Sequence, residues 1–308
     1  MSMKLLIDTD PGVDDALAIL MAHEHGDVQA LTIAAGNVGL KHTVTNALKL
    51  LEVIGAETPV YPGCEHPLVL AAADAAYVHG ADGFGDTGYD APLRAPNNEH
   101  AALAILRLSR EHAGELTLVA LGPLTNLALA LRLDPTLPTR IKRFVIMGGA
   151  VSGRGNTHLV PAEFNIGFDP EAAHVVFSSW PKFELVDWEA TLRHGLDYAD
   201  LEGWLAADSP RARFYDAISR RTRIWAREHE RERLLSADAL AMAVVLDPGI
   251  VTETLDRHVG IELAGTLTRG ATVVDWECRM GLTANARIVL AVDQQRFENL
   301  IRSALGAD

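Results

Sequence analysis

Apolar residues follow two different spacings along this chain of 308 residues. Continuous apolar runs of strand length occur at residues 4–7, 30–35, 116–121, 144–147 and 183–186. Apolar residues spaced three and four apart predict helices over residues 13–25, 44–54, 124–133, 170–177, 211–231 and 238–246. The tail predicts short strands within 259–292 and a last helix from 294. Strands that alternate with helices predict an α/β fold, with an open, mostly parallel, Rossmann-like sheet flanked by helices.

Composition and charge narrow the class of protein. With 48% hydrophobic and 22% charged residues, the chain has an ordinary globular composition, and the lack of a linker-like stretch favours a single domain over 1–308. The net charge of −14 argues against nucleic acid or an anionic membrane as a partner. The two cysteines, Cys64 and Cys278, lie far apart, and we recognise no signal peptide and no apolar segment of membrane length. We therefore expect a cytoplasmic protein.

Polar and glycine-containing loops follow four of the predicted strands. They cover residues 8–15, Gly36-Asn37, residues 122–126 and the long segment 148–168. In open parallel sheets, ligands bind beyond the carboxyl ends of the strands, often where the strand order reverses. We therefore expect these four loops to face one crevice.

The loop after the first strand is unusually acidic and reads Asp-Thr-Asp-Pro-Gly-Val-Asp-Asp over residues 8–15. Helix capping would explain one or two of its four carboxylates, because an Asp near a helix start accepts hydrogen bonds from backbone N–H groups. Four carboxylates this close repel one another and raise each other's pKa. A hard cation such as Ca²⁺, which takes about six to eight oxygen ligands, would relieve that repulsion. The motif therefore predicts a metal site that includes Asp10, Asp14 and Asp15.

Two other chemistries share parts of this pattern. An Asp-x-Asp pair after a first strand also occurs in phosphotransferases with an aspartyl nucleophile, and residues 85–90 imitate their later acidic motif. Those enzymes place a lysine between the two motifs, whereas the nearest lysines here lie on the helix directly after the second strand. Residues 83–88 match the Gly-x-Gly-x-x-Gly dinucleotide fingerprint, but they follow no predicted strand and open no predicted helix. Both interpretations are therefore weaker than the metal site.

Residues 8–15 resemble the N-terminal signature of the inosine-uridine preferring nucleoside hydrolases. Further segments follow in the order of that family, namely Gly36-Asn37, His79-Gly80, Leu-Gly-Pro-Leu-Thr-Asn at 121–126, Met-Gly-Gly at 147–149, Ala-Glu-Phe-Asn at 162–165 and Asp-Pro-Glu-Ala-Ala at 169–173. The resemblance extends over nearly the whole chain. It implies one nucleoside hydrolase-like catalytic domain with that family's open α/β fold, one bound Ca²⁺, and assembly as a homodimer or homotetramer.

The resemblance also implies a role for each matching residue. Ca²⁺ would be held by the carboxylates of Asp10, Asp15 and Asp238 and by the main-chain oxygen of Leu121. Asp10 would in addition take a proton from the attacking water, and Asp14 would accept a hydrogen bond from the ribose 2′-hydroxyl. The remaining sugar contacts would come from Asn37, Met147, Asn156, Glu163, Phe164 and Asn165. Asp8 would support the loop by hydrogen bonds.

Three of these residues also have a purely structural interpretation. Asn37 could take a left-handed turn after Gly36. Met147 ends a strand and could simply pack in the core. Asp238 could cap the apolar helix that follows it.

The part of the site that would hold the leaving base departs from the family pattern. Many members place either a histidine that protonates the base or an aromatic ring directly before the second-site Asp, where this chain has Ala237. His79 is the nearest replacement as a proton donor. Trp225 on the arginine-rich helix could stack on the base if that helix closes as a lid. Trp188 and Glu189 also differ from the Leu-Asp-Val-Thr sequence common in the family.

These features together predict a Ca²⁺-dependent hydrolase that cleaves the N-ribosidic bond of a small-molecule ribonucleoside by water attack. One alternative is a nucleoside- or ribose-binding protein that has lost turnover through Ala237. A second is the aspartyl phosphotransferase.

Overall fold

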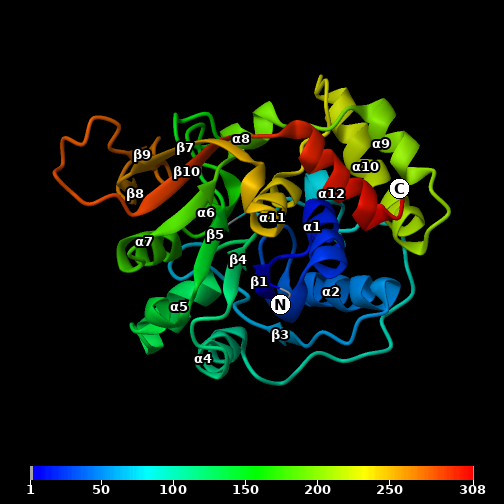
Figure 1. The fold of residues 1–308 in the computed structure, drawn as a ribbon, viewed down its shortest axis with the longest axis horizontal. Helices are drawn as coiled ribbons and strands as arrows, with labels where there is room; N and C mark the ends of the chain where they lie inside the picture. Colours follow the sequence, from blue (N-terminus) through cyan, green and yellow to red (C-terminus); the bar gives the residue numbers. More distant parts are fainter. Residues whose placement is uncertain (1–2, 72, 308) are drawn as a thin grey trace.

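The computed structural model describes residues 3–71 and 73–307, which surround one large sheet (Figure 1). Its eight strands lie in the order β3-β2-β1-β4-β5-β6-β10-β7, with all neighbours parallel except β7, which pairs antiparallel with β10. A second, two-stranded sheet contains β8 and β9. The strands are β1 (Lys4–Thr9), β2 (Asp27–Ile33), β3 (Val60–Pro62), β4 (Thr117–Ala120), β5 (Arg143–Met147), β6 (Phe183–Val186), β7 (Val251–Arg257), β8 (Val259–Ile261), β9 (Thr272–Val274) and β10 (Ala286–Val292). The predicted open, mostly parallel α/β sheet is confirmed.

Helices cover both faces of the sheet because successive strand residues point to opposite sides. In β1, Leu5 and Ile7 belong to one hydrophobic core and Leu6 to the other. The first core is closed by α1 (Val13–His25), α2 (Leu40–Ile54), α9 (Tyr198–Leu205), α10 (Pro210–Glu228), α11 (Ala237–Leu246) and α12 (Gln294–Leu305). The second is closed by α4 (Ala101–Glu111), α5 (Thr125–Leu133) and α7 (Pro170–Ser179), on the other side of the strands in Figure 1. In the part of the chain that the structure describes, we find no helix with the length and apolar character needed to cross a membrane.

The strand order places a topological switch point between β1 and β4. From β1 the chain moves outward on one side to β2 and β3, and it then returns to β4 on the other side of β1. The loops that leave β1 and β4 therefore diverge, and the crevice between them is where ligands of doubly wound sheets bind. Asp10 lies in the first of these loops, and Leu121 directly follows β4.

Several elements differ from the sequence-based prediction. The arginine-rich helix α10 ends at Glu228, so residues 229–235 form an irregular connection instead of continuing the predicted helix to 231. The edge strand β7 was not predicted, because its Thr-Glu-Thr-Leu-Asp-Arg stretch is largely exposed and polar. Neither were β3, α4, α9 and the short helices α3 (Ala76–His79), α6 (Phe164–Phe168) and α8 (Trp188–Arg193). Helices of four to six residues are too short to show a helical period.

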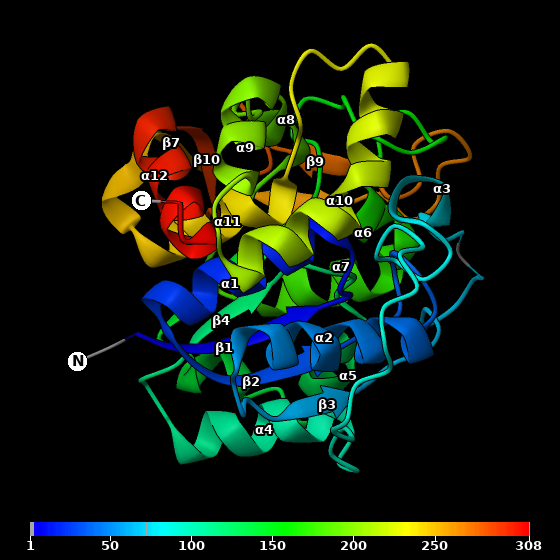
Figure 2. The same cartoon turned by 90° about the vertical axis from the view of Figure 1, so that its right-hand side faces the viewer.

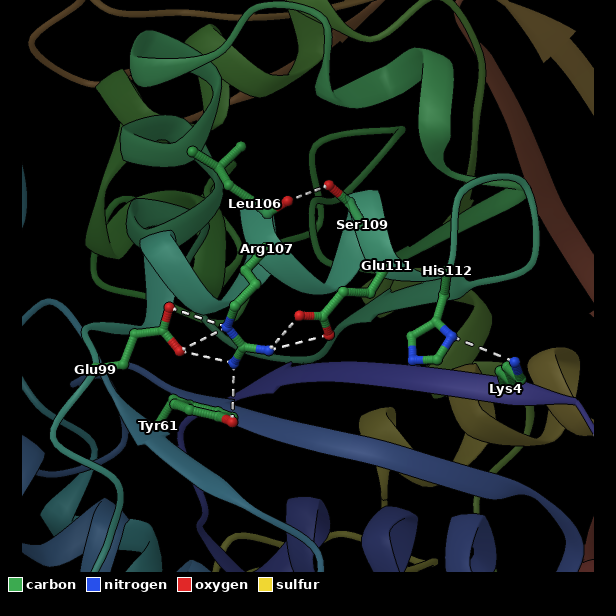
Figure 3. Close-up of polar contacts among 8 residues, drawn as sticks. All are labelled: Lys4, Tyr61, Glu99, Leu106, Arg107, Ser109, Glu111 and His112. Carbon is green, nitrogen blue, oxygen red and sulfur yellow. Dashed lines mark hydrogen bonds and ion pairs between the residues drawn. The ribbon is translucent and has the colours of Figure 1, made fainter.

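Figure 3 shows a polar cluster on α4, which covers the second core. Arg107 donates to both oxygens of Glu99, to Glu111 one turn later and to the hydroxyl of Tyr61, and its guanidinium lies 5.6 Å from the Tyr61 ring centroid. Tyr61 lies on β3, so the cluster fastens α4 to the end of the sheet that carries β3. Its residues take no part in the crevice between β1 and β4.

Asn285 joins the small sheet to the large one and provides a test of this architecture. Its Oδ1 accepts a hydrogen bond from the Val259 N–H at 2.8 Å, and its Nδ2 donates to the carbonyls of Val259 and Phe177 at 2.9 Å each. Asn285→Ala leaves these buried groups without partners, so we expect it to lower the free energy of unfolding by about 2–4 kcal/mol. Thermal denaturation measures the loss, and the exposed Asn299→Ala serves as the control. Equal stability of the two variants would contradict this role.

Candidate active site

Asp10 occupies the switch point itself. Its side chain is almost fully buried, and its Oδ2 accepts a hydrogen bond from the backbone N–H of Asn37 at 2.6 Å. Its Oδ1 is buried without a hydrogen-bond partner among the described residues. The lack of a Cβ at Gly36 and Gly122 makes room for this carboxylate, because a Cβ at either position would overlap one of its oxygens. A buried carboxylate oxygen that receives no hydrogen bond is well suited to coordinate a cation.

Asp15 holds the acidic loop in shape. It accepts hydrogen bonds from the Thr9 hydroxyl, from the backbone N–H of Gly12 at 3.0 Å and from Nδ2 of Asn37 at 3.0 Å. The first turn of α1 begins at Val13, so Asp14 and Asp15 both project from the positive end of that helix. Asn37 is not among the residues with positive φ, so its position depends on contacts to Asp10 and Asp15 rather than on a left-handed turn.

Asp238 brings a carboxylate from the far end of the chain to the same place. Asp14, Asp15 and Asp238 each offer an oxygen within 4.8 Å of the others. Burial, followed by the repulsion of its acidic neighbours, raises the pKa of Asp238, and burial and Asp15 raise that of Asp10 in the same way. Burial alone raises the pKa of Asp14 to about 6. A bound cation would favour the ionised form of every one of these groups, so the donor set fits a hard metal ion.

Asp8 supports the loop from below, as expected. It is fully buried at the end of β1, and its Oδ1 accepts hydrogen bonds from the Thr32 hydroxyl at 2.6 Å and from Nδ2 of Asn126 at 2.9 Å. Asn126 also accepts a hydrogen bond from the Cys64 N–H at 2.8 Å. These hydrogen bonds connect the loop after β4 with β1 and β2. They fix the position of the two sides of the switch point relative to each other.

The segment around α6 forms the opposite wall. Glu163 caps α6, since its carboxylate accepts hydrogen bonds from the backbone N–H groups of Asn165 at 2.9 Å and Ile166 at 3.2 Å, and it also accepts one from Gly149 at 2.9 Å. Burial raises the pKa of Glu163 to about 7. Asn165 donates to the main-chain oxygen of Leu121 at 2.6 Å and lies 3.2 Å from the Met147 sulfur. Asn156 accepts a hydrogen bond from the Phe164 N–H at 2.8 Å.

His79 lies next to the acidic loop at the end of α3. Its Nδ1 accepts a hydrogen bond from the backbone N–H of Val13 at 3.1 Å, so the neutral ring carries its proton on Nε2. Burial lowers the pKa of His79 to about 4, against the opposing effect of the Asp15 charge. The ring is therefore neutral at pH 7 and offers a hydrogen bond, without the positive charge of an imidazolium.

One pocket collects the residues singled out from the sequence. It is lined by Asp14, Asn37, His79, Leu121, Met147, Asn156, Glu163, Phe164, Asn165, Trp225 and Asp238, and Asp10 and Asp15 are buried behind this lining. The four loops that follow β1, β2, β4 and β5 thus face one crevice, as predicted. Neither Asp86 nor Asp90 of the phosphotransferase-like segment lines it.

The pocket contains further residues, most of which the sequence did not place there. They are mostly aromatic or apolar, namely Tyr77, Val78, Trp188, Tyr215, Thr222, Ala226, Arg231, Leu234, Leu235 and Ala237. They come from α3, α8, α10, the connection after α10 and the start of α11, and Figure 2 shows α3, α8 and α10 in its upper half. The hydroxyl of Thr222 donates to the Val78 carbonyl at 3.1 Å and joins α10 to α3. Of these, Ala237 and Trp188 had been singled out from the sequence, as departures from the family pattern on the side of the base.

The fold and this geometry define a class: an α/β enzyme with a metal-type acidic centre at the topological switch point of a doubly wound sheet. The model of the family described as inosine-uridine preferring nucleoside hydrolase matches residues 5–299, and the chain belongs to this family.

Individual relatives agree over almost their full length. The inosine-uridine preferring nucleoside hydrolase of Crithidia fasciculata is 35% identical over 99% of this chain and 98% of its own. The non-specific ribonucleoside hydrolase RihC of Klebsiella pneumoniae is 40% identical over 97% of this chain and 96% of its own. A solved inosine-guanosine nucleoside hydrolase superposes with a TM-score of 0.93 at 33% identity and covers 99% of both chains. The names of these relatives specify different bases. They therefore do not identify the base that this chain recognises.

Gly36 offers a sharp test of the Asp10 position. In Gly36→Ala the new Cβ would overlap Oδ2 of Asp10 and lie 2.9 Å from Pro123 Cδ, so the carboxylate must move. We expect the rate of ribose release to fall by about 100-fold, because a displacement near 1 Å has that effect on a positioned catalytic group. Gly39→Ala is the matched control, since its Cβ meets nothing within 4 Å. Full activity in both variants, with equal melting temperatures, would remove Asp10 from the reaction.

Proposed function

We propose that the protein catalyses the Ca²⁺-dependent hydrolysis of the N-glycosidic bond of ribonucleosides to free base and ribose. The observation that carries this proposal is the convergence of Asp14, Asp15 and Asp238, whose oxygens lie within 4.8 Å of one another, near Asp10, which has one oxygen buried and unpaired among the described residues. Asp10, Asp15, Asp238 and the Leu121 main-chain oxygen would hold the ion. Their all-oxygen chemistry suits calcium better than a softer metal.

Breaking an N-ribosidic bond builds positive charge on the sugar, as glycoside hydrolysis does in general. When bound, the cation supplies a fixed positive charge that orients the vicinal ribose hydroxyls and makes water easier to deprotonate. Asp10 takes the proton of the attacking water, and Asp14 accepts a hydrogen bond from the 2′-hydroxyl. Asn37, Asn156, Glu163 and Asn165 hold the remaining sugar oxygens, while Met147 and Phe164 pack against the ring. The carboxylates around the sugar also stabilise the charge that develops on it.

Because His79 is buried and neutral, it can have only a limited role toward the leaving base. A neutral imidazole that donates from Nε2 can hold a base or sugar oxygen, but it transfers a proton less readily than an imidazolium. Ala237, which is 5% exposed, can neither donate nor stack. This feature favours the second candidate function, a nucleoside- or ribose-binding protein without turnover.

A panel of nucleosides separates the two. The protein is incubated with inosine, guanosine, adenosine, uridine and cytidine, with and without a chelator, and reducing sugar is measured. Ribose release that stops on chelation and returns with Ca²⁺ supports the hydrolase. Saturable binding of the nucleosides without any ribose would support the binding protein instead.

Asp10→Ala tests the proposed centre directly. The variant loses a metal ligand and the proton acceptor together, so we expect no calcium-dependent rise in melting temperature and a rate lower by at least about 100-fold. Asp90→Ala, which removes an exposed carboxylate outside the pocket, is the control and should behave like the wild type. An Asp10→Ala variant with wild-type turnover would exclude this mechanism.

Ala237→His tests whether the missing proton donor limits the rate. General acid assistance is typically worth about 10²–10⁴-fold, and a poor leaving group such as uracil gains most from it. We expect kcat on uridine to rise by about tenfold or more, with a smaller change on inosine. Ala237→Asn provides a polar side chain without an equivalent proton donor and is the comparison. If kcat on uridine stays the same, the leaving base is assisted by another group.

A further inference from the structure

The base end of the pocket is rich in hydrogen-bond donors and has no carboxylate among its lining residues. All carboxylates that line the pocket, Asp14, Glu163 and Asp238, belong to the part assigned to the sugar and the metal. At the other end the polar side-chain groups are the Trp188 and Trp225 indoles, the hydroxyls of the two tyrosines and of Thr222, and one guanidinium, that of Arg231. Such a wall complements a flat ring that carries oxygen acceptors on its edge.

Arg231 reaches this wall because of the way α10 ends. The helix stops at Glu228, and Glu230 has φ 55°, in the left-handed region that non-glycine residues adopt at a cost in energy. The Arg231 N–H then bonds back to the Ala226 carbonyl at 2.9 Å. Three residues later, Leu234 exchanges two backbone hydrogen bonds with Leu196, at 2.8 and 2.9 Å. The connection is therefore fastened on both sides of Arg231.

The charge of Arg231 is unpaired, in contrast to its neighbours on α10. Arg221, Arg223 and Arg227 each form an ion pair with a carboxylate. Among the residues that the structure describes, no carboxylate pairs with Arg231, and its guanidinium lies 6.0 Å from the ring centroid of Trp188. At that distance the arginine gains a weak cation–π interaction and keeps its N–H groups for another partner.

Trp188 is a rigid support for this arginine, because both flanking carboxylates are tied to the loop after β5. Asp187 accepts hydrogen bonds from the N–H groups of Val151 at 2.9 Å and Ala190 at 2.8 Å. Glu189 accepts hydrogen bonds from the backbone N–H groups of Ser152 at 2.9 Å and Arg154 at 3.0 Å. The Trp188 N–H itself bonds to the Gly149 carbonyl at 2.9 Å.

We propose that Arg231, held above Trp188, binds the exocyclic oxygen of the leaving base and stabilises the negative charge that the base acquires. This inference rests on the proposed hydrolase function and assigns its specificity. The oxygen that Arg231 binds is the one at C6 of hypoxanthine or C4 of uracil, where adenine and cytosine carry an amino group, so hypoxanthine and uracil, called the oxo bases below, are preferred over adenine and cytosine. Arg231 thereby compensates for Ala237, which offers no proton. A guanidinium suits this role because it stays charged at any physiological pH.

The step is balanced without a general acid. The bond from C1′ to the base nitrogen breaks, and its electron pair moves onto the ring nitrogen and is shared with the exocyclic oxygen beside Arg231. The water oxygen bonds to C1′ and its proton goes to Asp10. The base anion then takes a proton from solvent, so that nucleoside and water give ribose and neutral base.

The test compares Arg231→Gln and Arg231→Lys with wild type on inosine, uridine, adenosine and cytidine, by steady-state ribose release. Arg233→Gln is the matched control, because it removes an exposed arginine of the same connection that does not line the pocket. We expect Arg231→Gln to lower kcat/KM on inosine and uridine by about 10- to 100-fold, chiefly through kcat, and to leave adenosine and cytidine within about threefold. Arg231→Lys, which keeps the charge but lacks the planar fork, should recover part of the loss.

The outcomes separate this proposal from the proposed function. Ribose release by wild type together with the selective loss on oxo bases supports both. Release by wild type with equal losses on all four nucleosides, or with no loss, overturns the role of Arg231 and leaves the hydrolase intact. If wild type binds these nucleosides but releases no ribose, both proposals fail. Unchanged melting temperatures of the variants establish that a loss is not one of folding.

Discussion

Electrostatic repulsion among buried carboxylates at one point of the sheet constrains the whole molecule. Asp14, Asp15 and Asp238 each offer an oxygen within 4.8 Å of the others, and burial together with the repulsion of neighbouring carboxylates raises the pKa of Asp10 and Asp238 well above the usual value. Backbone N–H groups and Asn37 satisfy some of the oxygens, but not all of them. Protein groups alone leave this cluster under-compensated, whereas a single divalent cation would compensate it. The residues present therefore fit a hard cation.

The scaffold meets this constraint at the switch point between β1 and β4. The order β3-β2-β1-β4-β5-β6 separates the loops after β1 and β4, and α1 begins directly after the acidic loop. Asp8 and Asn126 connect the strands below the crevice, and Gly36 and Gly122 leave the space that Asp10 fills. Because α11 packs on α1, Asp238 arrives at the start of its helix beside the first turn of α1. Carboxylates from both ends of the chain thus meet at one place.

Many of the residues singled out from the sequence line one pocket because they directly follow strands or begin helices. Position along the chain then determines position in space, as for Asp10 after β1 and Leu121 after β4. The base end was far less predictable. Arg231 was expected inside a helix, yet it enters the pocket because α10 stops at Glu228, and no residue type marks that end. Its contact with Trp188, more than forty positions away along the chain, depends on tertiary packing. Hydrophobic periodicity does not predict contacts of this kind.

The two ends of the pocket therefore differ in how substitutions affect them. The surroundings of Asp10 contain buried carboxylates, close-packed glycines and shared hydrogen bonds. A substitution there therefore disturbs several of these contacts at once. At the base end, Trp188 and Arg231 are attached to separate backbone segments and share no hydrogen bond, so one can change while the other stays in place. The absence of a proton donor at Ala237 is tolerable in such a design, because leaving-group stabilisation by charge can come from a different element than proton transfer would. Relatives of one fold can in this way keep the same sugar chemistry and differ in the base they release.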